Sequence, residues 1–203
     1  VLRAVQIALE ERIAQPILIG RPDVIEMRLA KIGSKLQAGE HFEVVNPNRD
    51  DRYKECWTAY HAQMKRHGVT IEIAKMRLRK DNTIIGAMLL KLGYADGMIA
   101  GVSGRFGHHL RQVEEIIGKA PGVKTMAAMN HLLLPGRALF ICDTHVNENP
   151  SAEEIAEIAQ MAAAEVKSFG IQPKVALLSH SNFGSSASAS ARKMAEATRL
   201  LRA

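Results

Sequence analysis

The sequence predicts an α/β protein with mostly parallel sheets. Helical and extended patterns alternate along the chain, and turn signals separate one from the next. The 203 residues are 47% hydrophobic and 24% charged, with 15 Gly and 7 Pro, as in ordinary globular proteins. Collagens, coiled coils and disordered tails are therefore excluded. A chain of this length has room for one large core or two smaller ones.

The first part of the chain supplies most of the predicted helices. Pro16 ends the first of them, Gly68 stops the third, and Thr70 is a suitable N-cap for the fourth. A segment that is apolar nearly all round, residues 83–92, predicts a helix buried between layers, with Gly93 as its C-cap. The helices are expected at residues 2–14, 24–32, 52–67, 71–80, 83–92 and 108–118, and the strands at residues 17–20, 42–45 and 98–100.

A Pro121-Gly122 pair is the best candidate for a domain boundary. We therefore expect a first subdomain over residues 1–122 and a second over residues 123–203. Both are expected to be partial, because the chain stops after a helix where a βαβ fold would return with another strand.

In the second subdomain, apolar strands at residues 126–134 and 138–146 are joined by Pro135-Gly136, which predicts a hairpin-like turn. Ser151 and Glu154 form a capping-box pattern at the start of a helix that ends at Gly170. A further strand is expected at residues 174–178, then a Ser/Gly loop at 179–190 and a last helix at 191–201.

The composition limits the partners. The apolar runs fall far short of the ~20 residues that cross a bilayer, so no membrane association is expected. No secretory leader is recognised, and Cys56 and Cys142 lack metal-ligand spacing, so a cytoplasmic location is expected. The net charge of +6 allows nucleic-acid binding or a pocket for a polyanionic small molecule. An aromatic content of 4% disfavours a base-stacking surface, and no nucleic-acid partner is expected.

The glycine-punctuated loop at residues 101–107 is the most informative local feature. It lies between a predicted strand and a predicted helix, where free N–H groups and the helix dipole favour anions. Arg105 and Arg111 could add charge-assisted bonds to phosphates. The G-x-x-G-x-x-G spacing matches neither a dinucleotide fingerprint nor a P-loop, so glycines that only serve a tight turn are the alternative.

Two further polar segments follow predicted strands. The loop at residues 179–186 has the same strand–loop–helix layout, although turn and capping duty is the simpler interpretation. Asp143, Thr144 and His145 could supply metal ligands, but no third ligand can be assigned, and a hydrogen-bonded network at a strand end is the simpler explanation.

Long, unusual strings resemble a known family. KLGYADGMIAG at residues 91–101, DTHVN at 143–147 and PSAEEIAEIA at 150–159 look like phosphotransacetylase. AMNHLLLP at residues 128–135 and LLSHSNFGSS at 177–186 resemble the phosphotransacetylase-like C-terminal domain of bacterial NADP-dependent malic enzymes. Together with shorter matches, the resemblance covers almost the whole chain.

This resemblance implies two α/β/α subdomains with a ligand cleft between them, the first completed by a segment that lies beyond Ala203. A Ser-Arg pair important for acyl transfer belongs to that segment. One further arginine of the family falls here on Met64 or Lys65, whereas another is kept as Arg111. Because lysine cannot reproduce a bidentate arginine clamp and methionine cannot hold an anion, acyl transfer is not expected of this chain.

The resemblance instead implies a regulatory and oligomerisation domain that binds acetyl-CoA as an allosteric effector. Malate oxidation and decarboxylation to pyruvate would belong to a separate N-terminal region with NADP and a divalent metal, and no metal or catalytic residue is expected here. An active phosphate acetyltransferase is the alternative. The effector site is expected among Ser103, Gly104, Arg105, His108, Arg111, Asn130, His180, Ser181, Asn182 and Ser185.

Overall fold

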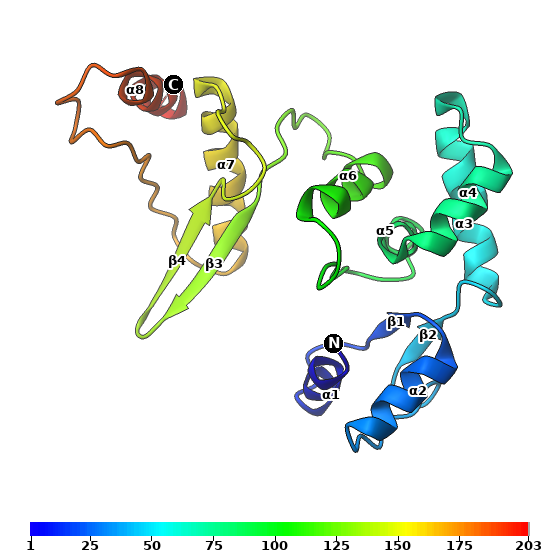
Figure 1. Cartoon of the computed structure of the whole chain (residues 1–203). Coiled ribbons are helices and arrows are strands. Elements are labelled where there is room, and N and C mark those ends of the chain that lie inside the picture. The colour runs from blue at the N-terminus through cyan, green and yellow to red at the C-terminus, as the bar shows by residue number, and fades with distance from the viewer. Residues whose placement is uncertain (203) are drawn as a thin grey trace. The chain divides into compact units, whose positions relative to one another are not determined.

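The computed structural model describes residues 1–202. The chain divides into two compact units, Val1–Gly118 and a second that begins at Lys119, just before the Pro121-Gly122 pair. Figure 1 follows the chain through both units, which are described separately below. Within residues 1–202, no helix combines the length and the apolar character that crossing a bilayer demands.

The first unit contains a short parallel sheet and six α-helices among its described residues. Strand β1 (Ile17–Ile19) pairs in parallel with β2 (Glu43–Val45), with Ile17 opposite Glu43. The helices are α1 (Leu2–Glu10), α2 (Pro22–Lys31), α3 (Asp51–Met64), α4 (Ile71–Lys80), α5 (Asn82–Lys91) and α6 (Phe106–Ile116), and a 3₁₀ turn, Lys65–His67, follows α3.

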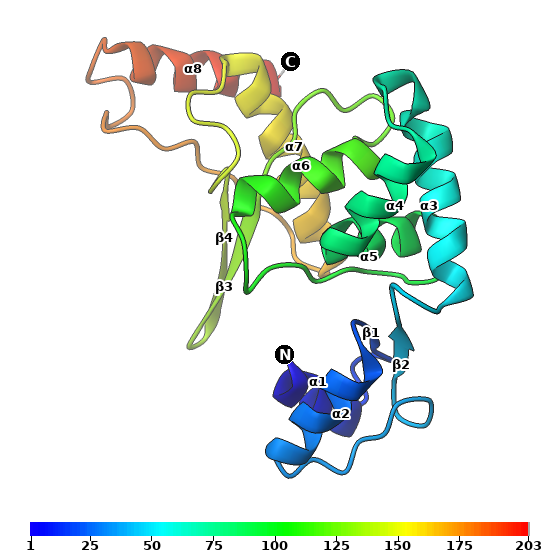
Figure 2. The same ribbon diagram turned by 45° about the vertical axis from the view of Figure 1, so that its right-hand side comes forward.

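The core of this unit surrounds α5, as its all-round apolar sequence predicts. Ile85 and Met88 of α5 are completely buried, together with Tyr60 of α3 and Leu78 of α4. Helices α3, α4 and α6 all contact α5, an arrangement that Figure 2 shows. Burial of apolar side chains on every face explains why a helix with little amphipathic character is stable here.

Helix starts and stops follow the local chemistry of the sequence. The hydroxyl of Thr70 accepts a hydrogen bond from the Ile73 N–H at 3.3 Å, and Gly68 adopts a left-handed φ of 78° after the 3₁₀ turn. The first helix ends earlier than predicted, at Glu10. Arg12 takes a positive φ there, and the Ile13 N–H closes the end by donating to the Ala8 carbonyl at 2.8 Å.

The second unit contains an antiparallel hairpin and two helices among its described residues. Strands β3 (Met129–Leu134) and β4 (Arg137–Cys142) pair antiparallel across the predicted Pro135-Gly136 turn. Helices α7 (Ala152–Ser168) and α8 (Ala189–Arg202) pack against each other, and α7 also contacts β4. The reciprocal capping box of Ser151 and Glu154 is present as predicted.

The α/β class is confirmed, but two predicted strands are wrong. Residues 98–100 and 174–178 form no ladder with another segment of the described chain. Each has an apolar sequence, yet Ile99 and Leu178 are exposed. An extended segment becomes a strand only when a neighbour satisfies its backbone groups, and neither segment has such a neighbour in the described chain. Of the two sheets, one is parallel and the other antiparallel, so "mostly parallel" overstates the topology.

Candidate functional site

The glycine-rich loop of the first unit runs directly into α6. Arg105 is the N-cap residue of α6, and its carbonyl accepts the N–H groups of His108 and His109 at 2.9 and 3.3 Å. Gly104 has a φ of 95° and Val102 a φ of 67°, so the loop uses left-handed backbone that is unfavourable for a β-branched residue such as valine. The whole loop is exposed, which leaves it accessible to a ligand.

Two consecutive histidines join the start of α6 to the start of α5. His108 Nε2 donates to Asp81 Oδ2 at 2.6 Å, and His109 Nδ1 lies 2.7 Å from the Thr83 hydroxyl. Asp81 also caps α5 by accepting the Thr83 N–H at 2.9 Å. Neither Asp81 nor Thr83 is singled out from the sequence, because their histidine partners are more than twenty residues away.

His109 connects this helix pair to the loop. Its Nε2 lies 2.8 Å from the carbonyl oxygen of Ser103. The ring passes so close to Gly104 that a Cβ at that position would come within 2.9 Å of His109 Nε2. Glycine at 104 therefore serves both the positive φ and the close approach of the histidine.

The environment of Asp81 favours its charged form. Burial opposes ionisation, but the hydrogen bonds from His108 and from Thr83 outweigh burial and hold the pKa of Asp81 below its ordinary value. The start of α5 thus carries a carboxylate that stays negative and already has its partners. Asp81 therefore holds the start of α6 through His108 and is not available as an acid or base.

The structure places five predicted site residues on this loop and helix. The Ser103 carbonyl and Gly104 meet His109, and His108 is paired with Asp81. The Arg111 Nε donates to the Gly107 carbonyl at 3.2 Å, while its side chain stays exposed. Within residues 1–202, the Arg105 side chain makes no hydrogen bond or ion pair, so it can reach an anion at no expense to the fold.

The other five predicted residues belong to the second unit, where three of them, Ser181, Asn182 and Ser185, are held by local turns. The hydroxyl of Ser181 accepts the Ser186 N–H at 3.0 Å, and the Ser185 hydroxyl accepts the Asn182 N–H at 3.2 Å. His180 is an exposed residue of the same loop. Asn130 lies on β3 and accepts a hydrogen bond from Thr144 at 3.2 Å. These bonds support turn formation, the simpler interpretation, without assigning a ligand.

Asp143 holds the turn that follows β4. Its carboxylate accepts the backbone N–H groups of Ala128, His145, Val146 and Asn147, and the Asn147 side-chain amide, at 2.6 to 3.3 Å. Burial opposes its ionisation, but these donors keep the pKa of Asp143 below its ordinary value. Across residues 1–202, no three His, Cys, Asp or Glu side chains gather in a way that suits a metal ion. The hydrogen-bonded network therefore explains Asp143 better than metal binding.

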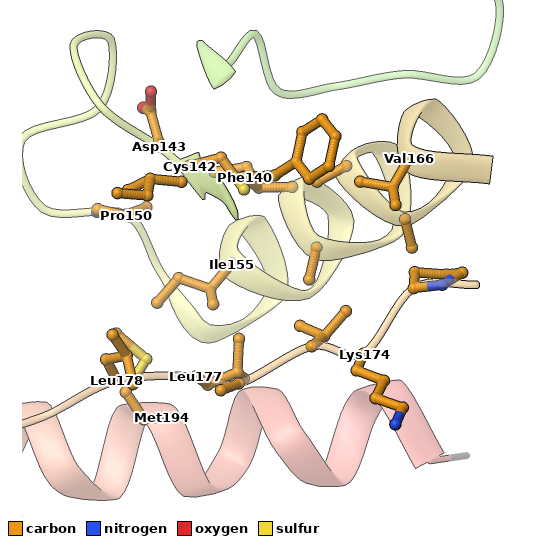
Figure 3. A pocket seen from close by; sticks show the side chains of 18 of the residues that line it. Phe140, Cys142, Asp143, Pro150, Ile155, Val166, Lys174, Leu177, Leu178 and Met194 are labelled. Carbon is orange, nitrogen blue, oxygen red and sulfur yellow. The ribbon is translucent and has the colours of Figure 1, made fainter. Parts of the chain in front are cut away.

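A cavity of about 720 Å³ lies within the second unit, and the sequence did not predict it. It is bounded by β4, α7, residues 171–178 and α8. Figure 3 shows its apolar lining, with Phe140, Ile155, Val166, Leu177 and Met194 around the space, while the Asp143 carboxylate points away from it. The signal in the sequence was two apolar runs, at 138–142 and 174–178, on either side of an amphipathic helix.

Three comparisons relate this geometry to known proteins. The sequence model of the family "Phosphate acetyl/butaryl transferase" matches residues 1–203. An NADP-dependent malic enzyme from Escherichia coli is 52% identical over 202 residues, and a phosphate acetyltransferase from Nitratidesulfovibrio vulgaris is 34% identical over 200 residues. The structure of a phosphotransacetylase from Streptococcus pyogenes superimposes with a TM-score of 0.85 at 30% identity.

The matches cover nearly all of this chain but only part of each relative. The chain is covered to 100% by the malic enzyme, 98% by the acetyltransferase and 99% by the solved structure. In turn, this chain spans 27% of the length of the malic enzyme, 28% of the acetyltransferase and 60% of the chain in the solved structure. The similarity thus describes one region that is shared by two kinds of larger enzyme.

Proposed function

Because the chain belongs to the phosphate acetyl/butaryl transferase family, we propose that it is the regulatory and assembly region of an NADP-dependent malic enzyme and binds acetyl-CoA as an allosteric effector. The observation that carries the proposal is the 52% identity to a malic enzyme, against 34% to a phosphate acetyltransferase, at similar coverage of the chain. The oxidative decarboxylation of malate, with NADP and a divalent metal, belongs to a separate N-terminal region of the same polypeptide.

The chemistry of the first unit supports an acidic ligand. Arg105 is the N-cap residue of α6, where the helix dipole is positive, and Arg111 lies in the second turn of the same helix. Coenzyme A carries several phosphate groups, and guanidinium groups bind phosphate oxygens through charge-assisted hydrogen bonds. The loop residues Ser103 and Gly104 and the neighbouring His108 complete this part of the proposed site.

One substituted position supports a binding role over a catalytic one. Of the two residues that the family resemblance aligns with an arginine, Met64 is buried in the core and Lys65 is exposed on the 3₁₀ turn. A buried thioether holds no anion, and an ammonium does not form the bidentate fork of arginine. We therefore expect the chain to bind acetyl-CoA without transferring its acetyl group.

In the proposed mechanism, acetyl-CoA acts by favouring one conformation of the malic enzyme. An effector shifts a conformational equilibrium only as far as its affinities for the two states differ. Acetyl-CoA therefore binds the less active state more tightly and inhibits malate oxidation. The second unit contributes to self-association through apolar surface, which several exposed side chains provide, among them Leu133, Leu139 and Ile141.

Acetyl-CoA binding is tested on the full-length protein by calorimetry, with malate-dependent NADPH formation measured in parallel. We expect saturable binding and a fall in the rate of NADPH formation over the same concentration range. Absence of binding at millimolar acetyl-CoA would contradict the proposal. Activity that is unchanged at saturating acetyl-CoA would contradict the allosteric part alone.

The contribution of Arg111 is tested by Arg111→Ala, with Arg28→Ala on the exposed face of α2 as a matched control. Loss of a charged hydrogen bond to phosphate corresponds to a Kd about tenfold higher or more. The Arg28→Ala variant should keep the wild-type Kd. An unchanged Kd in Arg111→Ala removes this residue from the site.

The alternative function is a working phosphate acetyltransferase, which the 34% identity to such an enzyme supports. It predicts formation of acetyl phosphate from acetyl-CoA and phosphate by the full-length protein. Binding of acetyl-CoA without acetyl phosphate formation favours the regulatory function.

A further inference from the structure

The glycine-rich loop has a specific tether to the body of the first unit, and that tether is His109. One ring nitrogen meets the Ser103 carbonyl in the loop, and the other meets the Thr83 hydroxyl at the start of α5. We infer that His109 is a positioning residue that fixes the conformation of this loop. By fixing the loop, His109 also sets the affinity of the loop for acetyl-CoA, and this second part rests on the proposed function.

The partners of His109 specify the tautomer of its neutral ring. A carbonyl oxygen only accepts, so Nε2 must carry a hydrogen that it donates to Ser103. In the neutral ring Nδ1 is then an acceptor, which receives the hydrogen of the Thr83 hydroxyl. Thr83 is only 6% exposed, so water cannot easily replace its partner. The Ser103 carbonyl thus selects the tautomer, and the buried Thr83 hydroxyl supplies the hydrogen-bond partner for the other ring nitrogen.

The loop needs such a tether because its backbone conformation is unfavourable. Val102 is a β-branched residue at a φ of 67°, and three glycines make the rest of the loop intrinsically flexible. Residues in such conformations persist where surrounding contacts hold them. The Ser103 carbonyl directly follows Val102 in the chain. The hydrogen bond from His109 to this carbonyl therefore stabilises the backbone beside the strained residue.

His108 does not perform this task. Its side chain joins α6 to Asp81, and its backbone N–H donates to the Arg105 carbonyl as part of the helix start. The two histidines are adjacent, with their rings 5.8 Å apart in an edge arrangement, and they take different partners. Between these two histidines, it is His109 that links the loop to α5.

The tether is tested by limited trypsin digestion of the full-length protein. The Arg105–Phe106 bond lies at the end of the loop and is cut faster when the loop leaves its folded conformation, because cleavage follows the population of the open form. The Lys35–Leu36 bond, in an exposed segment of the same unit, provides an internal reference. The quantity measured is the ratio of the two initial cleavage rates.

Two variants should raise this ratio. Removal of the ring in His109→Ala and of the hydroxyl in Thr83→Val each breaks a hydrogen bond of the tether, and we expect increases of about fivefold and about threefold. Thr83→Ser restores the hydroxyl and should return the ratio to within about twofold of wild type. His67→Gln, an exposed histidine of the same unit, is the matched control and should leave the ratio unchanged.

The results separate this inference from the proposed function. An unchanged ratio in His109→Ala overturns the tether, and a raised ratio in His109→Ala but not in Thr83→Val overturns the role of the hydroxyl. Acetyl-CoA binding is measured in the same variants, with a Kd for His109→Ala about fivefold higher expected. A looser loop with an unchanged Kd overturns the positioning role. If the wild-type protein binds no acetyl-CoA, the proposed function fails, while the digestion still decides whether His109 holds the loop.

Discussion

Asp143 illustrates how one carboxylate can organise several segments of backbone. It accepts hydrogen bonds from residues on both sides of the hairpin, Ala128 before β3 and three consecutive N–H groups after β4. Sequence reasoning left its role open between metal binding and a hydrogen-bonded network. The decisive information is the position of Ala128 and Asn147, which the residue types alone do not reveal.

The lowered pKa of Asp143 predicts acid sensitivity of the second unit. Because the folded pKa lies below the unfolded value of about 3.9, its contribution is complete above that value and is lost as the pH falls through the folded pKa. Asp143→Asn places an amide donor among N–H groups and should lower the free energy of unfolding at pH 7 by about 1–3 kcal/mol. Denaturant unfolding followed at pH 7 and at pH 3 measures both effects.

The control for Asp143 is Glu148→Gln, a nearby exposed carboxylate. This variant should change the free energy of unfolding at pH 7 by less than about 0.5 kcal/mol. An Asp143→Asn variant as stable as wild type at pH 7 would show that the network does not stabilise the turn.

The two cysteines should differ sharply in reactivity. Cys56 is completely buried, and burial, with a contribution from Glu55, raises the pKa of its thiol to about 12. Cys142 is exposed. A maleimide at pH 7.5 should therefore label Cys142 in the native protein and Cys56 only after unfolding, as peptide mass mapping can determine. Native labelling of Cys56 at a comparable rate would contradict its placement in the core.

At the scale of elements, the starts of helices are read from the sequence more reliably than the strands. Thr70 and Ser151 cap helices as their residue types predict, since an N-cap is satisfied within three residues. Residues 98–100 and 174–178 have strand-like sequences but no strand partner in the described chain. A strand depends on a neighbour that is distant in sequence, so apolar composition alone does not decide it.

The capping box of α7 gives a prediction at this scale. Ser151→Ala removes the hydroxyl that accepts the Glu154 N–H at 3.2 Å and should lower the free energy of unfolding by about 1 kcal/mol. Gln160→Ala, at an exposed position within the same helix, should change it by only a few tenths of a kcal/mol. Chemical denaturation measures both variants, and equal effects would contradict the importance of the cap.

At the scale of the whole molecule, each unit has its own apolar packing. The first unit packs around α5, where the sequence predicts a buried helix. The second leaves a cavity of about 720 Å³ beside α7. The cavity was not predictable, because its walls come from β4, residues 171–178 and α8, whose separation is a property of the folded chain.

The core of the first unit predicts a large effect at Ile85. Its side chain is 0% exposed, and Ile85→Ala should lower the free energy of unfolding by about 2–5 kcal/mol through lost burial and a residual cavity. Met76→Ala, at a residue of α4 that is 48% exposed, is the control, with an expected change below about 1 kcal/mol. Thermal and chemical unfolding of the two variants provide the comparison, and similar losses would contradict a core centred on α5.

The sequence by itself determined the α/β class, the buried α5, the helix caps, the hairpin turn and the family resemblance. These properties depend on neighbouring residues or on long strings of sequence, so they are readable without coordinates. Only the tertiary structure decided that His109 links Ser103 to Thr83, that Asp143 gathers backbone N–H groups, and that residues 174–178 face a cavity. The physical reason is that hydrogen bonds and packing join groups by their distance in space, which separation along the chain does not specify.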